Sequence, residues 1–583
     1  MKRFVSVFLI AAVLLTLCAC AKDDASAGDY SEVYDVISDY AKRNSYLQTN
    51  NHPYAMDDAD MVIAETAADQ SFSKTNAQVD GIDESDRIKT DGKYVYFLGG
   101  NKVRIYSAAG EESELIGCVE LKLEGDFLIS HMYVSDGVLM LLTYTQANDY
   151  AGSERTTVYY YDVSDPASPA LIGSAGQDGR LETSRLYDGK LYLISRYGAS
   201  REPNKLEPET YVPCFYRDGE ERLADSDCIS IAENPAGISY MVAAAYDAKT
   251  GETIAERSVL GAGGTIYMSL NDLYIAGSRY EDSREKVGTE GKRTVYNVSY
   301  KQYTDIMRIG LSDLETAATG TVEGLLNSQF SMDEKDGYLR LVTTKNFAYS
   351  TLRADEEQGT EYVEMSTGTG EESNSLYILG RDLSPVSELD GLAKNEQVYS
   401  VRFDGDIAYF CTFRQIDPLF AVDVSDPAAP KVLSELKISG FSEYLHTWSD
   451  DRLFGLGQEA DENSGRVQSL KLVMFDTSDK ANVGVKHSLV LGGINYTPAL
   501  YDHTALMISP ERGIFGFVSD LGYHIFAYSE AMGFAEQLCL APEGSFDAPR
   551  AVCVGDNAYI ASDFGLAVVS LNDYGVICSV DVN

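Results

Sequence analysis

The stretch Asp91-Gly-Lys-Tyr-Val-Tyr-Phe-Leu98, followed after a short gap by Val103-Arg-Ile-Tyr106, contains the unit that decides the fold. An acidic turn leads into an alternating apolar strand, and a second apolar strand follows. The pattern returns at Asp136-Gly-Val-Leu-Met-Leu-Leu142 with Val158-Tyr-Tyr-Tyr-Asp162. Further copies begin at Asp188, Asn271, Asp336, Asp404, Asp450, Asp502 and Asp556. Strand units that repeat every roughly 45 to 85 residues indicate an all-β chain folded as a β-propeller.

Each unit can be divided into four strands, and 40 tyrosines and 21 phenylalanines fit such strand-rich sequence. Nine candidate units can be counted, whereas propellers usually close with four to eight blades. We therefore predict about eight four-stranded blades, with seven to nine open. The proline-rich region Tyr197 to Gly237 and the Gly- and Glu-rich region Arg353 to Ser373 are predicted to be long loops.

The first twenty residues have the pattern of a targeting segment. Lys2 and Arg3 precede an apolar stretch, which ends in Leu17-Cys18-Ala19-Cys20. This ending resembles a bacterial lipobox, in which the cysteine at the position of Cys20 carries a lipid. An ordinary secretory signal cut near Ala19 or Ala21 is the alternative. No other run has the ~20 apolar residues of a membrane-spanning helix.

The chain is therefore expected to have three parts: the signal at 1–20, a tether with a short helix over Tyr30 to Leu47 at 21–75, and the propeller at 76–583. We expect an extracytoplasmic protein, lipid-anchored to the outer face of the cytoplasmic membrane or secreted.

The net charge of −43 excludes nucleic-acid binding by phosphate contacts. So many carboxylates provide solubility, or they attract cations such as calcium or a basic partner. Calcium is the one cofactor that the sequence leaves open, and its candidate ligands are clustered in two places: Asp80, Asp83, Glu84 and Asp86, and Asp461, Glu462 and Asn463. Solvated loop carboxylates are the simpler interpretation of both clusters.

Nine cysteines include Cys18 in the signal and Cys20 at its end, which leaves an odd number of seven. Cys214 and Cys228 bracket the proline-rich insertion, and Cys553 and Cys578 are expected on neighbouring strands of the last unit, so each pair is a candidate disulfide. The remaining cysteines, Cys118, Cys411 and Cys539, are interpreted as small apolar residues. None of the seven has the spacing of a zinc site.

Two groups of residues are candidates for ligand binding. Arg414 and Asp417 lie between two predicted strands of one unit, where an arginine–carboxylate pair would either join two blades or form a site at the mouth of the ring. His446, Trp448 and His503 fall near strand starts of adjoining units, and His131 has a comparable place in the second. If those starts converge on the central channel, these side chains could hold a ligand there. If not, they complete hydrogen bonds in the core.

Three stretches carry a resemblance to a known family: Thr75-Asn-Ala-Gln-Val-Asp-Gly-Ile-Asp-Glu-Ser-Asp-Arg-Ile-Lys-Thr-Asp-Gly92, Arg402 to Gly457 with Thr412-Phe-Arg-Gln-Ile-Asp-Pro-Leu-Phe420 and Gly440-Phe-Ser-Glu-Tyr-Leu-His446, and Tyr496-Thr-Pro-Ala-Leu-Tyr-Asp-His503. Over about Thr75 to Asn583 the chain resembles secreted bacterial proteins with a C-terminal β-propeller distantly related to WD-type repeats. The resemblance implies a propeller and an exported location. It implies no reaction and no catalytic residue.

Two functional hypotheses follow. The first is a binding module at the cell envelope, whose partner is a protein, peptide or polysaccharide. The alternative is an envelope hydrolase or lyase with a site at the channel mouth. The chain has no Gly-x-Ser-x-Gly elbow and no phosphate-binding loop of the Gly-x-x-x-x-Gly-Lys type, which favours binding. Propeller enzymes assemble their sites from several blades, so missing local motifs lower the enzyme hypothesis without removing it.

Overall fold

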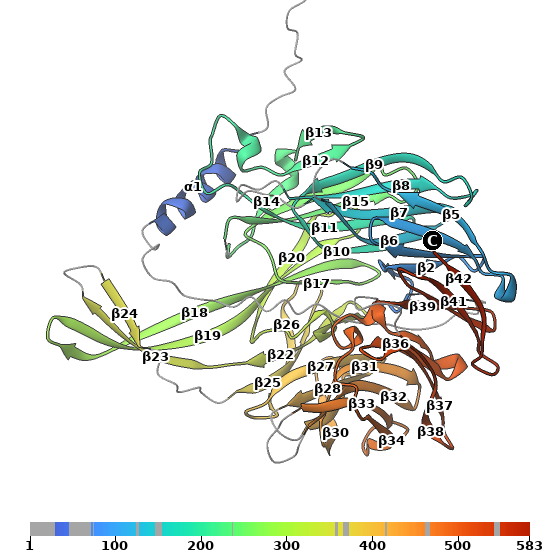
Figure 1. The fold of residues 1–583 in the computed structure, drawn as a ribbon. Coiled ribbons are helices and arrows are strands. Elements are labelled where there is room, and N and C mark those ends of the chain that lie inside the picture. Colours follow the sequence, from blue (N-terminus) through green and yellow to red (C-terminus); the bar gives the residue numbers. More distant parts are fainter. Residues whose placement is uncertain are drawn as a thin grey trace, which may run out of the picture.

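The computed structural model describes residues 29–45, 72–73, 75–123, 127–145, 154–235, 237–355, 360–364, 372–413, 417–460, 467–541 and 548–582. These residues form nine antiparallel sheets with a four-stranded core each, which confirms the propeller and lies at the upper end of the predicted seven to nine blades. We number the sheets as blades 1 to 9 in chain order. Figure 1 shows them arranged around a common centre, with the last strands beside the first.

The first four blades consist of the following strands. Blade 1 contains β2 (Ile88–Thr90), β3 (Tyr94–Gly99), β4 (Lys102–Ser107) and β5 (Leu115–Glu120). Blade 2 contains β6 (Phe127–Ser135), β7 (Val138–Thr145), β8 (Arg155–Asp162) and β9 (Ala170–Asp178). Blade 3 contains β10 (Arg180–Tyr187), β11 (Lys190–Gly198), β15 (Ser239–Asp247) and β16 (Thr253–Leu260). Blade 4 contains β17 (Thr265–Met268), β18 (Asp272–Glu290), β19 (Arg293–Gly310) and β20 (Thr316–Glu323).

The other five blades complete the ring. Blade 5 contains β21 (Met332–Lys335), β22 (Tyr338–Lys345), β25 (Ser373–Leu379) and β26 (Pro385–Leu392). Blade 6 contains β27 (Gln397–Asp404), β28 (Ile407–Phe413), β29 (Asp417–Asp423) and β30 (Lys431–Ile438). Blade 7 contains β31 (Phe441–Ser449), β32 (Arg452–Ala460), β33 (Val467–Asp476) and β34 (Gly484–Leu491). Blade 8 contains β35 (Met507–Ser509), β36 (Ile514–Ser519), β37 (Gly522–Ser529) and β38 (Gly533–Leu540). Blade 9 contains β39 (Arg550–Val554), β40 (Asn557–Ala561), β41 (Gly565–Ser570) and β42 (Val576–Asp581).

Apolar clusters between consecutive blades hold the ring together. Every neighbouring pair of blades shares at least one such cluster of buried side chains. The last pair closes the circle, because Val554 and Tyr559 of blade 9 pack with Ile88 and Val95 of blade 1. The outermost strands mostly alternate exposed and partly buried residues, as expected for strands with one solvated face.

The acidic turns follow the predicted pattern, with one exception. Asp136, Asp188 and Asp336 have positive φ and are each followed by a positive-φ glycine, as two-residue hairpin turns require. In blade 8, however, the turn after the first strand is the short helix η7 (Pro510–Arg512), and Asp502 precedes that strand. The predicted start at Asp502 was therefore misplaced within its unit.

The predicted helix near the N-terminus is confirmed as α1 (Ser31–Ser45). Its buried residues Val33 and Ile37 pack with Tyr211 and Val212 of the proline-rich insertion, and Tyr30 donates a 2.8 Å hydrogen bond to the carbonyl oxygen of Ala224. Among the residues that the structure describes, no helix is long and apolar enough to cross a membrane.

The sequence predicted a long loop for the proline-rich insertion, but the insertion contains strands. It contains η2 (Pro208–Thr210), β12 (Cys214–Arg217), β13 (Glu220–Leu223), η3 (Ser226–Cys228) and β14 (Ile229–Ile231). Strand β12 pairs with the outer strand of blade 2, and β14 pairs with the outer strand of blade 3. Buried residues such as Phe215 explain the difference, because they anchor the insertion to the blade edges.

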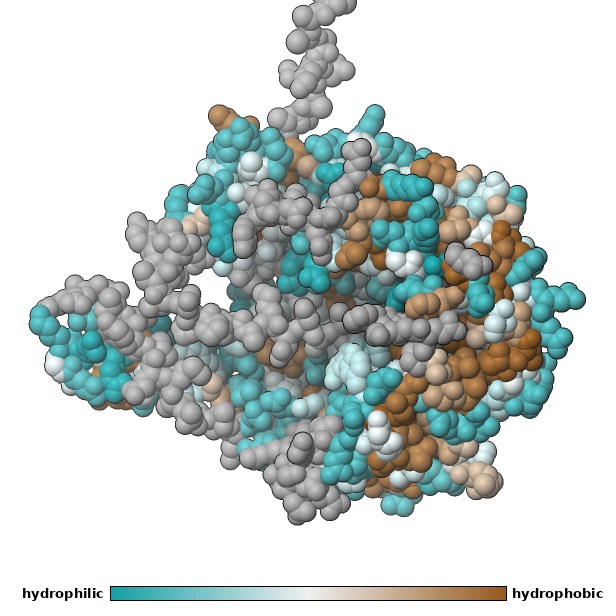
Figure 2. Space-filling view, viewed as in Figure 1, coloured by the Kyte–Doolittle hydropathy of each residue, from teal (hydrophilic) through white to brown (hydrophobic). Residues whose placement is uncertain are grey.

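The second predicted loop is also partly strand. Strand β24 (Thr360–Glu364) pairs with β23 (Ala348–Asp355), and β23 pairs with β19 of the long hairpin that β18 and β19 form. Together these four strands form an arm that projects from the ring (Figure 1). Hydrophilic side chains gather over the arm in Figure 2, which fits its many exposed charged residues.

The predicted disulfides are not formed, because all seven described cysteines are free thiols. Cys553 lies on the innermost strand of blade 9 and Cys578 on the outermost, with β40 and β41 between them. The prediction that they occupy neighbouring strands was therefore wrong. Cys214 begins β12, where it pairs with Leu223, while Cys228 ends η3.

Candidate functional site

A segment preceding blade 1 crosses the centre of the ring, and we call its described residues, 72–73 and 75–86, the strap. Phe72 forms a bridge with Val554 of blade 9, and the strap ends in a bridge between Asp86 and Met132 of blade 2. Between these points β1 (Asp83–Glu84) pairs with β10 of blade 3. The strap therefore connects blades that face each other across the ring.

Side-chain amides fix the middle of the strap to other blades. The Asn76 amide donates 3.1 Å hydrogen bonds to the hydroxyl oxygen of Tyr444 and to the carbonyl oxygen of His503. The Gln78 amide donates to the carbonyl oxygens of Gln329 and Met332 at 3.0 and 3.2 Å. Polar groups of several blades at the centre of the ring are thus occupied by hydrogen bonds from the strap.

One buried charge cluster centres on Glu84, which is 5% exposed. Its Oε2 lies 3.3 Å from an Arg185 guanidinium nitrogen and 3.3 Å from Nε2 of His503. Burial alone would raise the pKa of Glu84, but Arg185 and then His503 lower it to about 2. The carboxylate is consequently held ionised inside the ring.

A second cluster centres on Asp86, which lies 3.6 Å from Nε of Arg550, while Arg550 also binds Asp502. Burial raises the pKa of Asp86 to about 6 against the opposing effect of Arg550. Lys89 binds Oδ1 of Asp83 at 2.7 Å. These pairings occupy the carboxylates that the sequence offered as calcium ligands, except for exposed Asp80. The other group, at 461–463, lies outside the described residues.

The predicted site residues separate into three groups. His503 belongs to the Glu84 cluster and contacts the strap directly. His446 binds the Tyr444 hydroxyl at 2.7 Å through Nδ1, and Asn76 of the strap donates to that same hydroxyl oxygen. His131 lies near the second cluster, where burial lowers its pKa to about 4. Trp448 instead packs against Phe515 and other rings of blades 7 and 8, away from the channel.

The arginine–carboxylate pair predicted beside blade 6 stays a prediction. Arg414 lies outside the described residues. Asp417 begins β29, and its backbone pairs with Ile438.

The channel has two ends, which we name by the strands that line them. At the turn mouth the first strand of each blade ends, and at the start mouth it begins. A cavity of about 350 Å³ lies at the turn mouth, between the strap and blades 4 to 7. Four carboxylates and one guanidinium line it: Asp80, Asp333, Glu334, Asp404 and Arg402.

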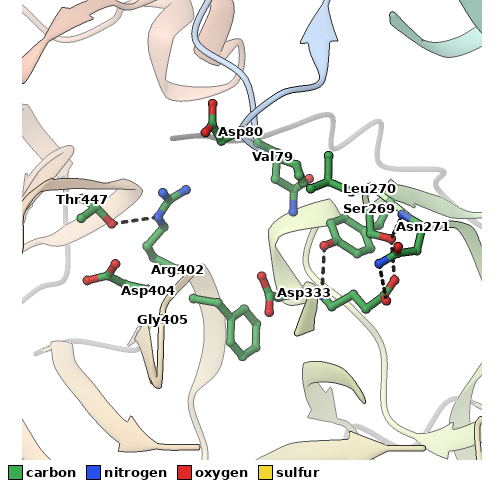
Figure 3. Close-up of a pocket in the computed structure, with 14 residues that line it drawn as sticks. Val79, Asp80, Ser269, Leu270, Asn271, Asp333, Arg402, Asp404, Gly405 and Thr447 are labelled. Atoms are coloured by element: carbon green, nitrogen blue, oxygen red, sulfur yellow. Dashed lines mark hydrogen bonds between the residues drawn. The ribbon is translucent and has the colours of Figure 1, made fainter. Parts of the chain in front are cut away.

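Most polar groups of the turn-mouth cavity already have partners within the chain. Glu334 accepts hydrogen bonds from Ser269, Asn271 and Tyr274 at 2.5, 3.1 and 3.1 Å. Asp333 accepts from Nε of Arg340 at 2.9 Å. Figure 3 shows the Arg402 guanidinium beside Thr447, to which its Nε donates at 3.2 Å. These lining groups are therefore satisfied by bonds within the chain itself, although the cavity is present.

The start mouth has a different local structure. The first strands of blades 2, 3, 6 and 7 each contain a bulge near their start, and the residues that these bulges leave without a direct partner are Ser130, Glu182, Tyr399 and Glu443. The first strand of blade 7 has a second bulge near its end, at Trp448. Bulges redirect side chains and are common next to active sites. These positions are not recognisable in the sequence, because one extra residue in a strand produces the same hydrophobic pattern as a shift of alternation.

Aromatic rings gather around Glu443 at the start mouth. Tyr496 and Tyr501 are 53% and 52% exposed and stack with their centroids 6.3 Å apart. Tyr399 packs edge-on against Phe441 at 5.1 Å. Burial, followed by the charges of Glu443 and the neighbouring tyrosines, raises the pKa of Tyr501. Half-exposed tyrosines next to a carboxylate form a surface able to receive a ligand.

Glu443 itself lacks a hydrogen-bond donor on one side. Its Oε2 is buried and, within the described part of the chain, has no hydrogen-bond partner. Burial raises the pKa of Glu443 to about 7. A buried carboxylate oxygen without a donor costs free energy, which a donor supplied by a ligand would recover.

Comparison with known proteins places this chain among propellers without assigning an activity. It is 27% identical to an uncharacterized protein of Archaeoglobus fulgidus over 94% of this chain and 91% of the relative. An uncharacterized protein of Methanocaldococcus jannaschii is 27% identical over 76% of this chain and 74% of the relative. A solved structure of a functionally unknown protein from Desulfotomaculum acetoxidans matches at 10% identity and a TM-score of 0.30, over 76% of this chain and 96% of that chain. The family model described as "Beta propeller domain" matches residues 72–573, and the chain belongs to this family.

Proposed function

We propose that this protein is an extracytoplasmic, lipid-anchored β-propeller that binds a protein or peptide partner of the cell envelope at the start mouth of its ring. The observation that carries the proposal is Glu443, whose buried Oε2 lacks a donor beside two half-exposed tyrosines. The anchor rests on Cys20 and its lipobox-like context, which lie outside the described residues. A bacterial and secreted origin, as the sequence resemblance implied, is part of the proposal.

A cationic side chain of the partner fits this mouth best. A lysine ammonium or arginine guanidinium would donate to Glu443, and tyrosine faces attract cations. The net charge of −43 would also attract a basic segment from a distance. Because Glu443 has a pKa of about 7, its ionised fraction rises with pH, and binding of a cation should tighten between about pH 6 and 8.

The hydrolase or lyase alternative is less well supported by the geometry. It depends on His446 or His503 reaching a substrate, and these side chains are 0% and 4% exposed. Both are engaged with groups of the chain itself. This burial is the reason that we favour binding over catalysis at the ring centre.

The test compares peptide binding by wild type and matched variants. Lysine-containing peptides and their acetyl-lysine counterparts would be titrated into purified protein by calorimetry. Glu443→Gln and Tyr501→Ala should each weaken binding of the lysine peptides at least ~10-fold, the effect of about 1.4 kcal/mol. Tyr280→Ala on the arm is the matched control, because Tyr280 is 54% exposed and lies away from the channel. Equal binding of acetylated peptides, or binding of envelope polysaccharide alone, would refute the proposed ligand class.

The proposed location has its own test. Metabolic labelling with a fatty-acid analogue should mark the wild-type chain and not Cys20→Ala, and only the wild type should stay with the membrane fraction. Labelling that survives the substitution would remove the lipid anchor from the proposal.

A further inference from the structure

Two groups of side chains outside the channel have the composition of a metal site. Within the described residues these are His524 with Glu536 and Cys539, and Asp225 with Cys228 and Glu256. In each group the candidate ligand atoms lie within 4.8 Å of one another. In the second group Glu256 already binds the Arg222 guanidinium through both oxygens, which neutralises its charge. The first group has no such competing cation in contact with its carboxylate among the described contacts.

The antiparallel register of blade 8 places the first group on one face of the sheet. His524 of β37 lies directly opposite Cys539 of β38, so their side chains point to the same side. Glu536, three residues before Cys539, reaches Nδ1 of His524 at 2.6 Å across a bulge in the same pair of strands. The group therefore results from strand pairing, and the spacing of a zinc finger is not needed to form it.

The other ring nitrogen of His524 is held by the neighbouring strand. Nε2 lies 2.7 Å from Oγ of Ser519 at the end of β36. That oxygen also accepts a 3.0 Å hydrogen bond from the backbone N–H of Leu521. Ligating histidines usually donate their second N–H to an oxygen that fixes the ring, and Ser519 is in place to be that oxygen. The imidazole, 1% exposed, is thus oriented with Nδ1 toward Glu536.

Although His524 is buried, the other two side chains of the group are open to solvent. The Glu536 side chain is 47% exposed and Cys539 is exposed, so an ion can reach the group from solvent. One imidazole nitrogen, one carboxylate oxygen and one thiolate suit a borderline divalent ion such as Zn²⁺, whose sites combine these ligand types. Calcium and magnesium are disfavoured because they prefer oxygen ligands only.

We propose that His524, Glu536 and Cys539 form a binding site for a Zn²⁺-like divalent transition-metal ion on blade 8, with Ser519 as the positioning residue. Three protein ligands leave a fourth coordination position for water or a ligand atom. The site is independent of the start mouth, so either proposal can fail without the other.

Cobalt substitution tests the site in the full-length protein. After treatment with a chelator, titration with Co²⁺ should give one equivalent bound with a thiolate-to-cobalt charge-transfer band, and Zn²⁺ should displace the cobalt. Cys539→Ser should abolish the band, while Glu536→Gln should weaken binding at least ~10-fold with the band retained. Cys118→Ser is the matched control, because Cys118 is also exposed but lies near the cations Lys102 and Arg104.

Alkylation provides a second measurement that needs no variant. Zn²⁺ should protect Cys539 from iodoacetamide and leave Cys118 reactive. Unchanged stoichiometry in Cys539→Ser, equal alkylation with and without Zn²⁺, or no Co²⁺ binding by wild type would each overturn the proposal. Labelling of Ser519 by a fluorophosphonate probe would do so too, because it would assign Ser519, His524 and Glu536 to a nucleophilic relay instead.

Discussion

The two mouths of the channel are built from the same strands, yet they differ in how their carboxylates are satisfied. At the turn mouth Glu334 accepts three hydrogen bonds, and Asp333 is paired with Arg340. At the start mouth Oε2 of Glu443 has no donor among the described residues, and two tyrosines beside it are half exposed. The carboxylates at the turn mouth therefore have their hydrogen-bond donors within the chain, whereas Glu443 at the start mouth lacks one.

This difference shows that cavity size and charge alone do not identify a binding site. Carboxylates that are fully bonded within the chain fix blades 4 and 5 to each other, as Glu334 does between β21 and the turn after β17. A carboxylate left without a donor is a cost that evolution keeps only where something else offsets it. The strap separates the two mouths, so its own stability decides whether the comparison holds.

The largest expected effect comes from removing the charge that anchors the strap. Glu84→Ala leaves Arg185 buried without its carboxylate, and loss of one partner of a buried pair typically costs about 3 to 5 kcal/mol. Chemical denaturation should show this loss in the free energy of unfolding. Glu120→Ala on the outer strand of blade 1 is the control and should leave it nearly unchanged, since its ion pairs with Lys102 and Lys122 are exposed.

A loss below about 1 kcal/mol for Glu84→Ala would mean that the strap is not held by this cluster. The two mouths would then be parts of one open channel, and the distinction between them would fail.

Much of the ring could be predicted from sequence because its signals are local. A strand pattern and a turn residue with positive φ, as at Asp188 and Gly189, need only neighbouring residues. Asp502 has the right residue type in a different place, because its carboxylate binds Arg550 of blade 9 instead of forming a hairpin turn. The insertion around Phe215 was missed for a related reason: its strand β12 pairs with the outer edge of a different blade, blade 2.

The site was less predictable, since its parts meet only through ring closure. His131, His446 and His503 were candidates for a ligand site in the channel or for hydrogen bonds in the core. In the structure His503 meets Glu84 of the strap, and His446 binds the hydroxyl of Tyr444, to which Asn76 of the strap also donates. Trp448 was a candidate with them, but it lies at a second bulge of β31 and packs against Phe515. Nothing in the sequence marked Glu443, because a bulge depends on the register of the partner strand.

An intermediate effect is expected from Glu443→Gln, and its size depends on pH. The folded protein raises the pKa of Glu443 to about 7 from the ordinary 4.5, so folding favours the protonated form. The contribution of Glu443 to the free energy of unfolding is therefore largest below about pH 4.5 and is lost as the pH rises through about 7. Glutamine removes this loss, and at pH 8 the variant should be more stable than wild type by about 1 to 3 kcal/mol.

Denaturation curves of both proteins at pH 5 and pH 8 check this prediction. The gain should be much smaller at pH 5, where Glu443 is largely protonated in the folded state. A variant that is less stable than wild type at pH 8 would show that the carboxylate has a donor in solution, and the start mouth would then be as complete as the turn mouth.

The smallest effect is expected at the turn mouth, where Glu334→Gln keeps the shape of the side chain and removes its charge. The amide still accepts through one oxygen, so the loss in the free energy of unfolding should be about 1 kcal/mol, the value of one ordinary hydrogen bond. Binding of lysine-containing peptides should be unchanged, because Glu334 is occupied by Ser269, Asn271 and Tyr274. Calorimetry on this variant next to Glu443→Gln separates the two mouths directly. If Glu334→Gln weakened peptide binding and Glu443→Gln did not, the cavity of about 350 Å³ would be the binding site, and its internal hydrogen bonds would have to open for the ligand.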